Sequence, residues 1–237
     1  MMPRVLFAAA ALAGLATVNL HAVPISGTFN ISGTITVTPT QIMWNLGSAP
    51  FTSQKATIDS GGTGSFSTLD GTLVTINNLN AATAPVGVNF PALPFITFDA
   101  APTFPVLDIN FIFTGIYSNA QCGAPPAVGQ TCTIGPPNSP FNFVNNPPGS
   151  GQATATFVFT GVTSDGLASW QGNFTSQFTA PYQSVLATLA ATGSVTNTFS
   201  ATFLVTQNPA VPEAGTMSLL GLGLVSLSYK LSRRRKA

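Results

Sequence analysis

The sequence predicts an all-β domain, an antiparallel β-sandwich or jelly roll with one short helix, set between two terminal targeting segments. Apolar and polar residues alternate through several stretches of the 237-residue chain. Such alternation is typical of strands with one buried face. The 22 glycines and 19 prolines, many of them clustered between these stretches, supply turns. No repeat of constant length is present, so a β-solenoid is the less favoured architecture.

Residues 1–22 have the layout of a secretory signal peptide. Arg4 precedes an apolar run that ends near Leu20, and the small residue Ala22 closes the segment. We expect cleavage after Ala22. A retained N-terminal membrane anchor is the alternative, but the apolar run is short and no basic stop follows it.

The strongest alternation runs from Thr28 to Thr38 and returns in residues 195–206. Further strands are expected near residues 42–46, 64–68, 72–76, 96–98, 107–113, 154–160 and 170–178. One helix of about ten residues is expected after Pro181, with Gly193 beyond its end. Together these elements form one domain, residues 23–208, which is long enough to bury a core.

Cys122 and Cys132 are the two cysteines of the chain, and they bracket a loop rich in proline and glycine. In an exported protein, a closely spaced even pair predicts a disulfide. A metal or redox pair is the alternative. The spacing is not Cys-x-x-Cys and no third ligand is near, so the disulfide is favoured.

Six of the seven basic residues of the chain lie in its two end segments. The domain holds a single basic residue, Lys55, against five aspartates, which gives it a net charge of about −4. A domain with this charge balance lacks the basic patch that nucleic-acid binding requires. The one histidine, His21, lies in the signal peptide, which removes His-dependent nucleophilic catalysis and the usual zinc sites. We therefore predict a non-enzymatic protein with no catalytic residues, no metal site and no cofactor.

Carboxylates are the remaining candidates for chemistry. Asp99 and Asp108 could serve as the two carboxylates of a glycosidase. Three other aspartates adjoin glycine-rich turns and could bind calcium: Asp59, Asp70 and Asp165. Structural roles are the favoured interpretation, in turns for Asp59, Asp70 and Asp165 and on the polar face of a strand for Asp108.

Trp44 and Trp170 allow two interpretations. Both could form a platform on which sugars stack. Both also lie in phase with the apolar face of a predicted strand, which favours a place in the core.

Residues 209–237 contain three consecutive features. Val211, Pro212 and Glu213 form a short motif. An apolar run of about sixteen residues follows, from Ala214 to Tyr229, and predicts a single membrane helix. The basic residues after it are expected to hold the end of the chain on the cytoplasmic side: Lys230, Arg233, Arg234, Arg235 and Lys236.

This arrangement resembles the PEP-CTERM sorting domain of exported Gram-negative bacterial proteins. Ala214 departs from that pattern, which has proline there. The resemblance implies transit through the inner membrane and recognition by an exosortase-like processing enzyme. It also implies a producer of exopolysaccharide. A plain membrane anchor is the alternative to processing. We expect a cell-surface or extracellular-matrix protein, with a carbohydrate-binding module acting on exopolysaccharide as the alternative.

Overall fold

The computed structural model describes residues 24–47, 54–135, 139–147 and 152–209. Its strands are β1 (Gly27–Val37), β2 (Gln41–Asn45), β3 (Lys55–Asp59), β4 (Leu73–Ile76), β5 (Leu79–Asn80), β6 (Leu93–Phe98), β7 (Leu107–Ile112), β8 (Thr131–Cys132), β9 (Asn142–Asn145), β10 (Ala153–Thr163), β11 (Ala168–Phe178) and β12 (Val195–Gln207). A short 3-10 helix, η1, spans Gly64–Phe66, and the α-helix α2 spans Tyr182–Thr192. The predicted signal peptide and the sorting segment from residue 210 onward lie outside the described residues.

Eight of the strands form a closed antiparallel barrel. Their order is β11-β12-β1-β3-β4-β6-β7-β10, and pairing of β10 with β11 closes the ring. The predicted sandwich is therefore wrong, although the all-β class and the single α-helix of the described residues are confirmed. A barrel and a sandwich both need strands with one apolar face, so alternation cannot tell them apart.

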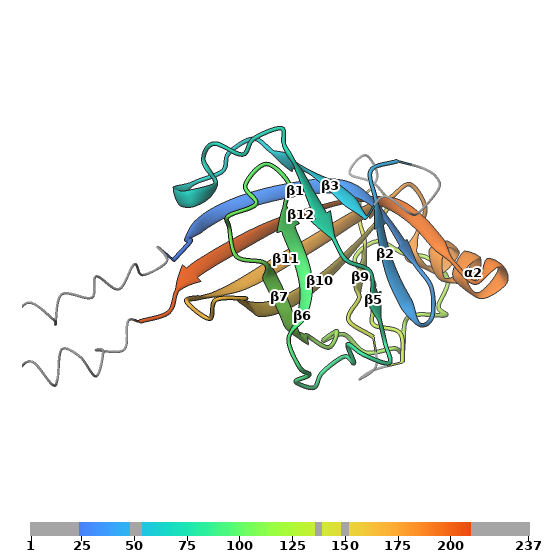
Figure 1. Cartoon of the computed structure of the whole chain (residues 1–237). Helices are drawn as coiled ribbons and strands as arrows, with labels where there is room; N and C mark the ends of the chain where they lie inside the picture. The colour runs from blue at the N-terminus through green and yellow to red at the C-terminus, as the bar shows by residue number, and fades with distance from the viewer. Residues whose placement is uncertain (1–23, 48–53, 136–138, 148–151, 210–237) are drawn as a thin grey trace, which may run out of the picture.

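Two long strands change partners midway and so open one end of the barrel. β1 pairs with β3 through residues 30–32 and with β2 through residues 34–37. β10 pairs with β7 through residues 159–163 and with β9 through residues 153–156. At this end β2 and β9 diverge from the ring, and α2 lies beside the opening (Figure 1). Gly27, the first residue of β1, pairs with Val205 near the end of β12. The start of β1 and the end of β12 therefore lie side by side, at the end of the barrel opposite α2 (Figure 1).

The barrel interior is filled by aromatic rings. Phe29 stacks on Phe203 with centroids 4.8 Å apart, and Phe157 stacks on Phe174 at 4.9 Å. Trp44 is fully buried and Trp170 is 3 % exposed, so their predicted place in the core is confirmed. The Trp170 indole N–H donates to the Asp108 carbonyl oxygen at 3.0 Å. Neither tryptophan is available as a sugar platform.

Some local predictions failed. Residues 64–68 form η1 and a turn, because Gly64 adopts a positive φ of 58° and its Cα hydrogens face the Ser26 carbonyl in a space without room for a Cβ. β3, β5, β8 and β9 were not anticipated. β8 and β9 are short and lie within the stretch 122–151, whose proline and glycine content predicted a loop. The helix was predicted well, since α2 follows Pro181 and ends at Gly193 in the left-handed region. Among the described residues, no helix has the length and apolar character needed to cross a membrane.

Candidate functional site

Asp99 and Asp59 are both occupied by neighbouring polar groups. Asp99 accepts a hydrogen bond from Thr75 at 2.9 Å and forms an ion pair with Lys55 at 2.6 Å. Asp59, on β3, accepts a hydrogen bond from the Ser32 hydroxyl on β1 at 2.8 Å. These contacts join adjacent strands on the outside of the barrel. They give the two carboxylates structural roles.

Asp70 and Asp165 brace turns. Asp70 accepts hydrogen bonds from the backbone N–H groups of Gly61 and Gly62, both at 3.3 Å. Asp165 accepts one from the Leu167 N–H at 3.0 Å. Within the described part of the chain, no three His, Cys, Asp or Glu residues gather closely enough to hold a metal ion. The aspartates that were considered for calcium therefore do not form a cluster of three among these residues.

Asp108 lies on β7, and partial burial raises the pKa of its carboxyl group by desolvation. Its register partner on β6 is Pro94. Asp99 lies five residues beyond Pro94, which corresponds to roughly 15 Å along a strand. Glycosidase carboxylates are separated by about 5–10 Å. The structure does not bring Asp99 and Asp108 together as such a pair.

Cys122 and Cys132 form the predicted disulfide, with their Cα atoms 5.1 Å apart. Cys132 is fully buried on β8. It belongs to a second apolar cluster, outside the barrel core, that includes Phe143, Tyr182 and Val185. The disulfide therefore stabilises the loop against which the first turn of α2 packs.

Hydrogen bonds tie the N-terminal end of α2 to this loop. The Tyr182 hydroxyl donates to the carbonyl oxygen of Gln121 at 3.0 Å, and its backbone N–H donates to the Asn145 side chain at 3.0 Å. Gln183 accepts from Asn145 at 2.9 Å and donates to Gln130 at 2.8 Å. Asn145 thus caps the helix from a distant strand, since Pro181 at the N-cap has no side-chain donor or acceptor. The helix is held at this end.

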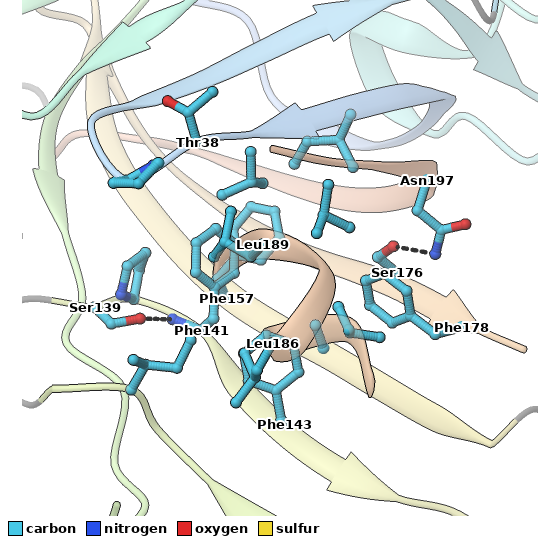
Figure 2. Close-up of a pocket in the computed structure, with 18 of the residues that line it drawn as sticks. Thr38, Ser139, Phe141, Phe143, Phe157, Ser176, Phe178, Leu186, Leu189 and Asn197 are labelled. Carbon is cyan, nitrogen blue, oxygen red and sulfur yellow. Dashed lines mark hydrogen bonds between the residues drawn. The ribbon is translucent and has the colours of Figure 1, made fainter. Parts of the chain in front are cut away.

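The rest of α2 covers an apolar pocket of about 580 Å³ at the open end of the barrel (Figure 2). Its walls come from β1, β9, β10, β11, β12 and α2. The aromatic and aliphatic side chains of the wall are Ile35, Val37, Ile134, Phe141, Phe143, Phe157, Phe178, Val185, Leu186, Leu189 and Val195. In Figure 2, Leu186 and Leu189 of the helix face Phe157 and Phe143 of the sheet. We call this cavity the α2 pocket.

The polar side chains of the α2 pocket are engaged with the fold itself. Ser176 donates to the Thr198 carbonyl oxygen at 2.8 Å. Asn197 donates to the Ser176 hydroxyl at 2.9 Å and to the backbone of Gln177 at 2.7 Å. The Thr38 hydroxyl accepts from the backbone of the tight turn that follows β1. The Ser139 hydroxyl accepts a hydrogen bond from the backbone N–H of Phe141 at 3.3 Å. The other side chains of the lining are apolar.

The α2 pocket was not anticipated from the sequence. One signal pointed toward it: Val185, Leu186 and Leu189 share an apolar face of the predicted helix. That face would ordinarily be expected to pack directly on the core. Only the exchange of partners along β1 and β10 shows that the sheet opens beneath it.

A second, more polar depression of about 320 Å³ lies over Gly161. Its lining includes the amide and hydroxyl side chains of Asn110, Thr160, Ser169, Gln171 and Thr206. We call it the outer groove.

Together these features define a closed antiparallel β-barrel protein with an apolar pocket at its open end. Residues 210–236 match the family model of the PEP-CTERM protein-sorting motif, which confirms the resemblance. The chain thus carries the signal of an exported protein that is anchored through its C-terminus before an exosortase processes it. No curated protein and no solved structure matches the chain.

Proposed function

We propose that this is a non-enzymatic protein of the cell surface or extracellular matrix, delivered there by its sorting motif. The matched segment contains Val211, Pro212 and Glu213 together with the basic end of the chain. Its C-terminal position allows the whole barrel to be exported before the anchor is recognised. The domain preceding it becomes the delivered part.

The use of the aspartates is the observation that supports a non-enzymatic role. Four of the five aspartates in the described residues accept hydrogen bonds that brace strands or turns. The fifth, Asp108, lies apart from Asp99 along the sheet. General acid and base catalysis needs carboxylates that converge on one substrate atom. Asp99 and Asp108, the pair considered for glycoside hydrolysis, do not have that arrangement.

Localisation and processing test the proposal together. In a strain with its exosortase, we expect the protein outside the inner membrane, with an intact mass that ends near Val211–Gly215. In a strain lacking that enzyme, the full-length chain should remain with the inner membrane. A chain that stays cytoplasmic in both strains would refute the proposal. An exported protein that still ends at Ala237 would show that the motif is not cleaved.

Catalysis is tested on the exported protein. We expect no release of reducing sugar from the producer's exopolysaccharide. Hydrolysis that disappears in the Asp108→Asn variant would show that the non-enzymatic part is wrong.

The outer groove favours a second candidate, binding of exopolysaccharide. Neutral hydroxyl and amide side chains are suited to hydrogen bonding with sugars, and the groove is open on the outer surface of the barrel. Binding on an array of bacterial glycans should weaken when Gln171 and Asn110 are changed to Ala. The same change at Gln177, an exposed residue of β11 that does not line the groove, is the control. Absence of binding to every glycan would eliminate this candidate.

A further inference from the structure

The α2 pocket is bounded by well-packed side chains. Phe157, at its floor, is 1 % exposed and belongs to the barrel core. Phe143 and Ala155 are 6 % and 3 % exposed and belong to the second cluster, with Val185 of the helix. The pocket lies between these two apolar clusters, and neither fills it. Its volume of about 580 Å³ falls within the range of about 300–1,000 Å³ found for small-molecule sites.

The lining carries no charge. In the described part of the chain, no Asp, Glu, Lys, Arg or His contributes to it. Lys55, the basic residue of the domain, is paired with Asp99 elsewhere. A carboxylate or phosphate entering the pocket would lose hydration and gain no partner, which is costly. The chemistry therefore selects against ionised ligands.

The hydrogen-bonding groups of the wall are already engaged. Ser176 and Asn197 bond to each other and to the backbone. A ligand that depends on many directional hydrogen bonds, such as a sugar, would find few free partners. Hydrocarbon contact remains as the main source of affinity.

The described chain ends far from the pocket. β12 begins beside the pocket at Val195 and runs away from it for 13 residues. At about 3.3 Å per residue, its end lies roughly 40 Å from the pocket. Both ends of the described barrel chain, at β1 and β12, lie at the end opposite α2 (Figure 1).

We propose that the α2 pocket binds one uncharged, mainly aliphatic molecule, such as a fatty alcohol or a neutral acyl ester. The barrel supplies a rigid aromatic floor, and α2 supplies the aliphatic cover through Leu186 and Leu189. The hydroxyl or ester end of the ligand leaves bulk water together with the chain when the molecule enters the pocket. Binding of this kind adds a carrier or scavenger activity to the surface protein.

The experiment uses the exported protein with the dye Nile red and two competitors, dodecanol and dodecanoate. Nile red should bind with one dye per chain and gain fluorescence. Dodecanol should displace it at a concentration at least about tenfold lower than dodecanoate, because only the carboxylate must be desolvated without a partner. Equal competition by the two would overturn the proposal.

A matched pair of variants locates the site. Ala190 and Ala191 are both exposed on α2, but Ala190 lines the α2 pocket and Ala191 does not. Ala190→Trp should fill part of the cavity and weaken dodecanol binding by about tenfold or more. Ala191→Trp adds the same side chain to the same helix and should bind as wild type does. Equal affinity of the two variants would exclude this pocket as the site.

A charge variant tests the selectivity independently of cavity filling. Leu189→Lys places a cation at the wall, where it can pair with a carboxylate. Its preference should shift from dodecanol toward dodecanoate, and an unchanged preference would contradict the proposal. Gel filtration completes the test, since a wild-type dimer that Ala190→Trp makes monomeric would identify a second copy as the occupant.

Discussion

Loss of the Cys122–Cys132 bond should destabilise the domain by an amount that the loop size predicts. The two cysteines are separated by 10 positions in the sequence. In the chain-entropy model, cross-linking a loop of this size restricts the unfolded chain by about 2.7 kcal/mol near room temperature. Reduction keeps both sulfur atoms and removes only the bond. Reduced wild-type protein should therefore lose about 2.7 kcal/mol of unfolding free energy.

The double variant Cys122→Ala, Cys132→Ala should lose somewhat more than the reduced protein, because Cys132 is fully buried and its sulfur fills core space. Urea unfolding of the oxidised, reduced and double-alanine proteins measures the three free energies. Amide hydrogen exchange along α2 provides a second measurement, since Tyr182 of the helix bonds to Gln121 beside the disulfide. We expect faster exchange in the first turn after reduction. A reduced protein within about 1 kcal/mol of the oxidised form, with unchanged exchange, would refute the reasoning.

Two further predictions concern β10 and β7. A Cβ at Gly161 would overlap the Asp108 carbonyl oxygen and approach the Trp170 ring to 2.8 Å, so Gly161→Ala should cost about 3 kcal/mol in urea unfolding. Gly123→Ala meets no atom within 4 Å and should stay within about 0.5 kcal/mol of wild type; similar losses in both would show that the close contact at Gly161 is not decisive. Desolvation raises the pKa of the Asp108 carboxyl above 3.8 in the folded protein, so its contribution is most favourable below pH 3.8 and is lost as the pH rises through the raised value. Asp108→Asn should therefore gain stability relative to wild type as the pH rises through that window, and a difference that does not vary with pH would contradict this.

Local patterns were enough to predict individual elements. β1 and β12 appeared as alternating stretches because each keeps one face against the core through much of its length. α2 was recognisable from Pro181 and Gly193, which have defined roles at helix ends. The disulfide was predictable because cysteine pairing in an exported chain depends on few local factors.

The geometry of the candidate sites was harder to predict from the sequence. Asp99 and Asp108 are near neighbours in sequence, yet the β6–β7 register separates them. The residues of the α2 pocket come from strands far apart in the chain, such as Ile35, Ala155 and Val195. Which of them face one cavity depends on register and on the end at which the sheet opens. Neither the strand register nor the open end of the sheet can be predicted from the alternation of apolar and polar residues.

The sequence by itself determined that the protein is exported and sorted through its C-terminus, and which kind of elements it contains. The sorting motif, the alternating strands and the cysteine pair are local signals that require no knowledge of distant contacts. Tertiary structure alone decided that the sheet closes into a barrel, because closure depends on the pairing of β10 with β11 and of β7 with β10. It also decided that one end remains open, since β1 and β10 exchange partners there. An apolar helix face that could have packed on a core instead covers a pocket.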